Sequence, residues 1–82
     1  MTRIPINVPD LGMETEEMKF GAWLKQAGDP VNAGEDLFEI EADKATVVCE
    51  ALDGGTLAET TVTVTGQELK QGDVLGWLER LN

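Results

Sequence analysis

One lysine stands alone in the middle of an acidic chain. Residues 41–47 read EADKATV, and Lys44 is the only Lys or Arg between Gln26 and Leu69. Nearby carboxylates favour the charged ammonium form, whereas an amine nucleophile must lose its proton to react. Lys44 is therefore a poor catalyst, and it is either an ordinary solvated turn residue or an accessible amine that a modifying enzyme recognises. The acids that lead up to it are Glu35, Asp36, Glu39, Glu41 and Asp43.

The residue types that other chemistries need are missing. The chain has no His and no Ser, and its one cysteine is Cys49. Serine and Cys–His catalysis therefore have no components, and no carboxylates are spaced as in a calcium loop. Cys49, within TVVCEA, is expected to be a small, buried strand residue. We expect no catalytic residue and no metal site, so the domain is not predicted to be an enzyme.

The charge balance excludes several partners. Six basic residues against sixteen acidic ones give a net charge of −10, which is unfavourable for binding nucleic acid or an anionic membrane. No apolar run approaches the roughly 20 residues of a membrane span, and MTRIPINVPD lacks the apolar core of a signal peptide. The 82 residues suit one small domain. We expect a soluble intracellular protein, or a piece of one.

Short alternating runs separated by turns predict an all-β fold. RIPINV, MKFGAWL, ATVVCEA and TVTVT read as strands, and turn signals recur at PDLG, GDP, AGED, LDGG, TGQ and QGD. This pattern is typical of a small sandwich or barrel. Strict alternation points Trp23 outward, whereas a bulge near Gly21 would turn it inward; the sequence leaves both orientations open.

An internal repeat with an offset of 38 residues relates GDPVNAGEDLFEIE to GQELKQGDVLGWLE. It predicts two similar halves related by a pseudo-two-fold axis, with glycines at equivalent turns. Lys44 corresponds to Asn82 under this offset, so its hairpin and the chain ends are expected at equivalent, opposite places. The matched pairs are Gly28 and Gly66, Val31 and Leu69, Gly34 and Gly72, Leu37 and Leu75, Ile40 and Leu78, and Glu41 and Glu79.

The sequence resembles the lipoyl domains of 2-oxo acid dehydrogenase complexes. The resemblance is carried by EADKATV together with GDPVNAGEDLFEI before it and DGGTLAE and KQGDVLGWLE after it, and it runs from VPDLGMETEE almost to the end. It implies one domain over residues 1–82, which belongs to a dihydrolipoamide acyltransferase chain. The implied fold is a flattened barrel-sandwich of two four-stranded antiparallel sheets with pseudo-two-fold symmetry.

The resemblance also implies a function. A lipoate ligase or lipoyl transferase attaches lipoic acid to Lys44 through an amide. The resulting swinging arm carries acyl groups and electrons between a thiamine-dependent 2-oxo acid decarboxylase, the acyltransferase core and dihydrolipoyl dehydrogenase. The domain itself is then a monomeric, non-catalytic carrier in the bacterial cytoplasm or the mitochondrial matrix. The resemblance assigns recognition to residues of the hairpin and of the loop after the first strand: Asp43, Ala45, Glu41, Leu11, Gly12, Met13 and Glu14.

Two departures from the family leave the local strand register open. Met18 stands where many members have Gly, and TTVTVTG is one residue longer than usual. Two alternatives to a lipoyl domain also stay open. A biotinyl domain has the same fold and a Met-Lys-Met motif, which EMKF around Lys19 only partly matches; the other alternative is an unmodified interaction module. DKATV slightly favours pyruvate or acetoin systems, but neither the 2-oxo acid nor the continuation past Asn82 follows from the sequence.

Overall fold

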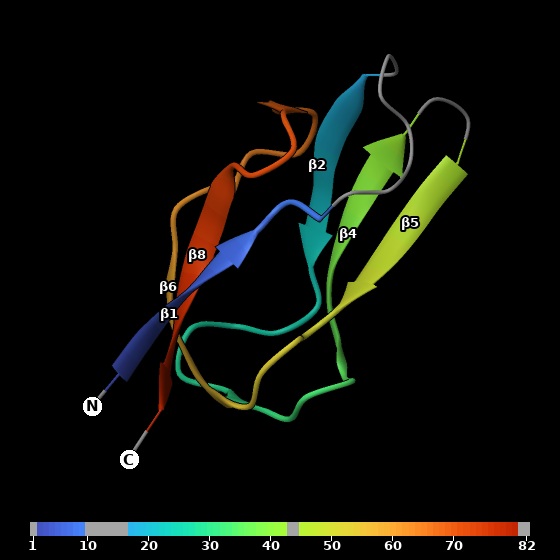
Figure 1. The fold of residues 1–82 in the computed structure, drawn as a ribbon. Helices are drawn as coiled ribbons and strands as arrows, with labels where there is room; N and C mark the ends of the chain where they lie inside the picture. The colour runs from blue at the N-terminus through green and yellow to red at the C-terminus, as the bar shows by residue number, and fades with distance from the viewer. Residues whose placement is uncertain (1, 10–16, 43–44, 81–82) are drawn as a thin grey trace.

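Residues 2–9, 17–42 and 45–80, described by a computed structural model, form strands and turns only (Figure 1). The strands make two four-stranded sheets, in the orders β1-β8-β6-β3 and β5-β4-β2-β7, and every pairing is antiparallel. This confirms the predicted all-β, two-sheet architecture. The strands are β1 (Thr2–Asn7), β2 (Met18–Trp23), β3 (Pro30–Val31), β4 (Asp36–Ala42), β5 (Ala45–Glu50), β6 (Gly55–Thr60), β7 (Glu68–Leu69) and β8 (Val74–Arg80).

The predicted repeat is a structural repeat. β3 and β7, and likewise β4 and β8, lie 38 positions apart in the chain. Gly28 and Gly66 have φ of 98° and 91°, a region that favours glycine. Their backbone N–H groups make equivalent bonds, since Gly28 donates to Leu57 and Gly66 donates to Phe20. The halves are therefore related by the expected pseudo-two-fold symmetry.

The rest of each half follows the same symmetry with other offsets. The N–H of Gly34 donates to the carbonyl of Ala51, and the N–H of its equivalent Gly72 donates to the carbonyl of Val8. Ala51, just after β5, is therefore equivalent to Val8, just after β1, with an offset of 43 residues. β2 has a bulge between Phe20 and Ala22, and β6 has one between Leu57 and Glu59. The equivalent bulged strands are offset by 37 residues, which accounts for the mismatch of one residue between the halves in the sequence.

The core fills the space between the two sheets. Its largest fully buried side chains are Phe20, Phe38, Leu37, Ile40, Leu57 and Leu75. The bulge in β2 turns Trp23 toward this core, where its ring lies 5.9 Å from that of Phe20 and 5.6 Å from that of Phe38. The inward orientation is therefore the one adopted. Met18 is also buried and pairs with Ala42, so the methionine is accommodated in an ordinary antiparallel register.

The prediction of a strand at TVTVT was wrong. β6 ends at Thr60, and residues 61–65 cross from one sheet to the other. The N–H groups of Thr61 and Val62 both donate to Leu75 in β8, whereas Thr65 Oγ1 donates to the carbonyl of Gly21 in β2. Trp23 Nε1 donates to the Val62 carbonyl at 2.7 Å. These bonds replace a strand ladder with a bridge between the two sheets.

Candidate functional site

The β4–β5 hairpin is held in a defined register up to its last pair. Glu41 pairs with Thr46, and Ala42 pairs with Ala45. Only Asp43 and Lys44 separate Ala42 from Ala45 in the sequence; both lie outside the described residues. Two residues is the commonest length for the connection of a β-hairpin. The described register thus ends at the pair that flanks the predicted lysine in the sequence, and the role of Lys44 stays a prediction.

The base of this hairpin is anchored in the core on one side and open to solvent on the other. Ala42 and Ile40 are at most 1% exposed, and Ala42 also pairs with Met18 of the neighbouring strand β2. Glu41, Ala45 and Thr46 are exposed. An anchored base with an exposed outer face suits the presentation of an attached group, because the strands fix its origin while partners can approach.

The hairpin and the chain ends occupy equivalent positions at opposite ends of the molecule. Ala42 and Ala45 correspond to Arg80 and Thr2 under the offsets of 38 and 43 residues, and Thr2 pairs with Arg80 as Ala45 pairs with Ala42. In Figure 1 the N and C labels lie at the lower left, and the paired ends of β4 and β5 lie at the upper right. The molecule extends 38 Å along its longest axis, so the base of the hairpin is well separated from the paired ends of β1 and β8.

Acidic side chains dominate the surface that leads to the hairpin. Glu41 is exposed and lies directly across from Lys19 of β2, and Glu39 lies across from Val48 of β5. At the start of β4, Glu35 accepts a hydrogen bond from the Asn32 N–H at 2.7 Å and one from Lys25 Nζ at 3.1 Å. The Asn32 N–H, and then the Lys25 ammonium, lower the pKa of Glu35.

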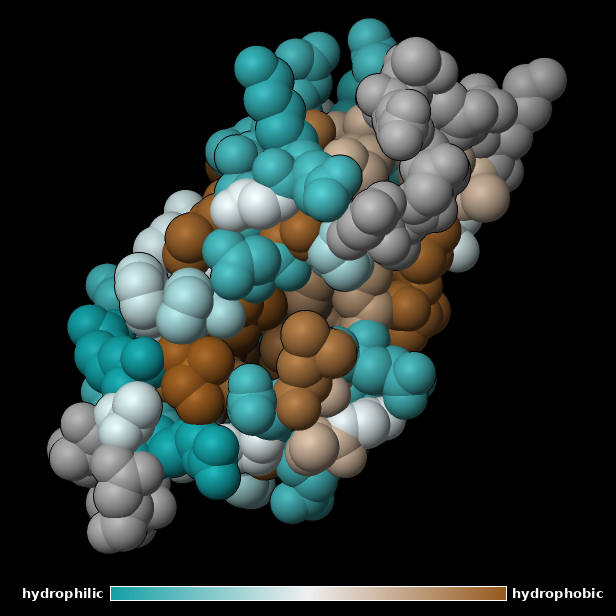
Figure 2. All heavy atoms as spheres, viewed as in Figure 1, coloured by the Kyte–Doolittle hydropathy of each residue, from teal (hydrophilic) through white to brown (hydrophobic). Residues whose placement is uncertain are grey.

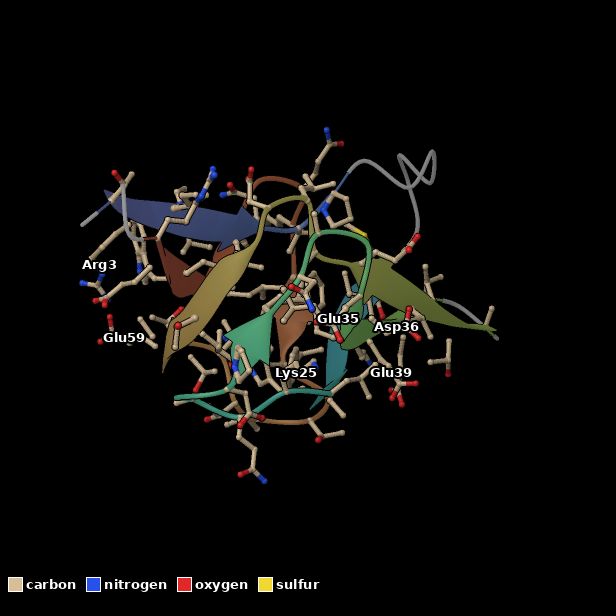
Figure 3. The ribbon with its side chains drawn as sticks, turned by 90° about the horizontal axis from the view of Figure 1, so that it is seen from below. Arg3, Lys25, Glu35, Asp36, Glu39 and Glu59 are labelled. Atoms are coloured by element: carbon tan, nitrogen blue, oxygen red, sulfur yellow. The ribbon has the colours of Figure 1, made fainter. Side chains whose placement is uncertain are left out.

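Two of the described basic residues, Lys25 and Arg3, form ion pairs with acids, whereas Lys19 lies across from Glu41. Figure 3 places Lys25 beside Glu35, and it places Arg3 beside Glu59 at the end of the molecule away from Asp36 and Glu39. Arg3 is 2.8 Å from Glu59 and also lies over the ring of Trp77. The hairpin therefore presents an acidic approach, which a partner with basic residues complements.

The predicted recognition residues divide into two groups. Glu41 and Ala45 are exposed on the base of the hairpin. Asp43, together with Leu11, Gly12, Met13 and Glu14 of the first loop, lies outside the described residues. The described chain resumes at Glu17, and the next residue, Met18, pairs with Ala42. The C-terminal end of the first loop therefore enters the sheet beside the base of the hairpin.

Neither a metal centre nor a reactive thiol accompanies the hairpin in the described part of the chain. No group of His, Cys, Asp and Glu residues there could hold a metal ion. Cys49 is buried, as expected, and burial raises the pKa of its thiol, so the thiolate is disfavoured. No described helix is long and apolar enough to cross a membrane.

Sequence reasoning missed one feature of the site's surroundings, a groove between the edge strands β1 and β5. Its walls include Ile6 and Leu78 of one sheet and Phe38 and Cys49 of the other. Alternation within single strands does not show which two edges face each other across a sandwich. The offset of 43 residues between the two strands is the signal that would have paired them.

Comparisons with known proteins identify relatives of this chain. A family model described as "Biotin-requiring enzyme" matches residues 4–78. The chain is 39% identical over 75 residues to the dihydrolipoyllysine-residue acetyltransferase component of the pyruvate dehydrogenase complex of Rickettsia conorii. It is 41% identical over 69 residues to the corresponding component of Rhizobium meliloti. These matches cover 92% and 82% of the chain but only 18% and 15% of the relatives.

A solved structure gives the same result for the fold. The lipoyl domain of the 2-oxoglutarate dehydrogenase complex from Azotobacter vinelandii superposes with a TM-score of 0.72 at 27% sequence identity, and the match covers 94% of this chain and 96% of that domain. The two-sheet barrel-sandwich is thus shared over nearly the whole of both chains. Together with the family match over residues 4–78, it shows that the chain belongs to the family of biotin- and lipoyl-bearing domains.

Proposed function

We propose that this chain is a lipoyl carrier domain and that Lys44 is its attachment site. The observation that carries the proposal is the pairing of Ala42 with Ala45, which leaves only Asp43 and Lys44 in the sequence to connect the two strands, of which β4 is anchored in the core. Lys44 suits the attachment of lipoic acid, because forming the amide requires one accessible amine. When attached, the dithiolane supplies the acyl- and electron-transfer chemistry, and the protein supplies presentation.

The chain's own residues have two tasks in this function. The buried pair Ile40 and Ala42 fixes the base of the hairpin, so that the arm always starts from one place. Glu41 and Ala45, with Asp43 and the segment Leu11–Glu14, provide the surface by which partners distinguish this hairpin. We assign no catalytic residue to the chain, and residues 1–82 form one carrier domain in this proposal.

The partners follow from the relatives. They are named as components of pyruvate dehydrogenase complexes, from bacteria and, in Arabidopsis thaliana, from mitochondria. We therefore propose that the domain is part of a dihydrolipoamide acyltransferase chain that serves pyruvate, in the bacterial cytoplasm or the mitochondrial matrix. Its partners are a lipoate ligase or lipoyl transferase, a thiamine-dependent decarboxylase, the acyltransferase core and dihydrolipoyl dehydrogenase. Tethering raises the effective concentration of the arm at each active site.

The experiment that tests the carrier function is modification in vitro followed by transfer. The purified chain is incubated with a lipoate ligase or with a biotin ligase, and intact mass is measured. We expect one lipoyl group per chain and no biotin. Modification by the biotin ligase alone would instead support the biotinyl alternative, and modification by neither ligase would support an unmodified interaction module.

The choice of 2-oxo acid is tested separately with the lipoylated domain. Decarboxylase components specific for pyruvate and for 2-oxoglutarate are each supplied with substrate, and acylation of the domain is followed by mass in single turnovers. We expect faster acylation with the pyruvate component. Faster acylation with the 2-oxoglutarate component would overturn the substrate assignment while leaving the carrier function intact.

A further inference from the structure

An apolar groove lies between the edge strands β1 and β5. β1 is the outermost strand of one sheet and β5 that of the other, and the groove between them has a volume of about 330 Å³. Figure 2 shows hydrophobic residues gathered around the centre of this face. The apolar walls and floor come from both sheets: Ile4, Ile6, Leu37, Phe38, Cys49 and Leu78.

Two large apolar side chains on the lining of this groove face solvent. Leu52 is 89% exposed and Val48 is 44% exposed. The core is otherwise well covered, since Phe38 and Leu78 beneath them are 2% exposed. Exposed apolar groups next to an apolar groove mark an interaction site more often than isolated ones do. Leu52 and Val48 therefore have exposed apolar surface that a partner could bury.

The two sides of the groove differ where the pseudo-symmetry would make them alike. Val48 corresponds to Pro5 and Leu52 corresponds to Pro9 under the offset of 43 residues. Proline lacks a backbone N–H and blocks strand addition along β1. β5 reads ATVVCE and contains no proline, so each of its residues has a backbone N–H group. It also contains no lysine that would discourage strand addition. An extended peptide can pair with such an edge while alternate side chains enter a neighbouring pocket.

The charges on the groove select the partner. Among the lining residues that the structure describes, Glu50 and Asp53 are the charged ones, and none is Lys or Arg. Asp36, directly across from Glu50 on β4, adds a further acid. Asp53 lies 3.8 Å from Arg80. Among the described lining residues, Glu50 is therefore the acid to which a partner's cation is assigned. A second copy of this chain carries the same net charge of −10 and is repelled.

We propose that this groove docks an extended segment of a partner protein in which an apolar side chain is flanked by lysine or arginine. The segment lies along β5, its apolar side chain contacts Val48 and Leu52, and its cations face Glu50. The groove begins at Val48, three positions beyond Ala45, so a docked partner lies near the base of the hairpin. The proposal stands on the described strands alone and does not depend on lipoylation of Lys44.

The test uses the unmodified chain and three short peptides. The probe is acetyl-Lys-Val-Leu-Val-Lys-amide; the controls replace both lysines by glutamate or all three apolar residues by serine. Binding is followed through amide chemical shifts of the ¹⁵N-labelled chain. We expect saturable shifts along β5 and at residues 51–53 with the probe alone. Equal binding of the glutamate peptide, or shifts centred on another surface, would overturn the proposal, as would no binding at millimolar peptide.

Matched variants distinguish binding in the groove from nonspecific binding of the peptide. Leu52→Ser should weaken probe binding about fivefold, because part of an apolar contact is lost, whereas Val64→Ser, at an exposed position outside the groove, should leave it unchanged. Glu50→Gln should weaken binding about twofold and reduce its salt dependence, and Glu68→Gln should do neither. A second copy as the true occupant would appear as self-association that Leu52→Ser abolishes, and it would overturn the proposal.

Discussion

Replacing Gly72 by alanine should lower the free energy of unfolding by about 1–2 kcal/mol, through backbone strain alone. Gly72 has φ of +91°, which an L side chain rarely adopts, and an added Cβ would meet no atom within 4 Å. No steric clash therefore contributes. A domain of this size has a stability of about 4–12 kcal/mol, and the melting temperature should fall by about 5–15 °C.

The pseudo-symmetry makes this prediction stricter. Gly34 has φ of +90° and equally open surroundings, so Gly34→Ala should cost the same within about 0.5 kcal/mol. Gly34 and Gly72 bond to different carbonyls, those of Ala51 and Val8, so the double variant should show the sum of both losses. Gly54→Ala is the matched control, since Gly54 lacks the positive φ and its Cβ would lie 3.4 Å from the Val31 oxygen, an ordinary contact.

The assay is thermal and urea unfolding followed by circular dichroism. Unchanged stability of Gly72→Ala, or a loss in Gly54→Ala as large as that in Gly72→Ala, would refute the assignment of Gly34 and Gly72 to strained turns that hold the half-barrels. As a contrast, Gly76→Ala should lose more, about 3 kcal/mol, because its Cβ would overlap the Glu59 carbonyl oxygen between β8 and β6.

Three further predictions concern single contacts and the hairpin. Trp23→Phe removes the 2.7 Å bond to the Val62 carbonyl and should cost about 1–3 kcal/mol in urea unfolding; an unchanged midpoint would mean that the bridge at residues 61–65 does not depend on this bond. Glu35 has a pKa lowered from 4.5 by the Asn32 N–H and Lys25, so it contributes stability above its unfolded-state pKa that is lost as pH falls through its folded-state pKa. Glu35→Gln should therefore melt below the parent at pH 7, with a difference that shrinks below about pH 4. A difference in melting temperature that stays constant with pH would contradict the linkage. Exchanging Asp43 and Lys44 keeps the composition but moves the amine by one position; lipoylation should stop while circular dichroism and melting stay unchanged, and equal rates of lipoylation would show that position is not recognised.

The repeat is the part of the fold that the sequence predicts best. Gly28, Gly34, Gly66 and Gly72 recur at one offset because each occupies a turn with positive φ, and the apolar matches recur because the same strands face the same core. The predicted turn between the halves agrees with the pairing of Ala42 with Ala45, between which only Asp43 and Lys44 stand in the sequence. These features depend on local turns and on alternation, which a sequence displays directly.

Long-range contacts account for what the sequence did not predict. TVTVT has the composition of a strand, but bonds to Leu75, Gly21 and Trp23, all distant in the chain, hold it as a bridge. The groove between β1 and β5 likewise depends on which edges face each other. The roles of Asp43 and of Leu11–Glu14 in recognition stay predictions, because these residues lie outside the described part of the chain.

The most direct test of the central claim is to locate the modified residue. The chain and its Lys44→Arg and Lys19→Arg variants are each treated with a lipoate ligase, digested, and sequenced by tandem mass spectrometry. Lys19 is the matched control, because it lies in the EMKF segment that partly resembles a biotin motif and faces Glu41 across the sheet. We predict a lipoyl group on Lys44 alone in the parent and in Lys19→Arg, and none in Lys44→Arg. Lipoylation of Lys44→Arg at any lysine would contradict the account.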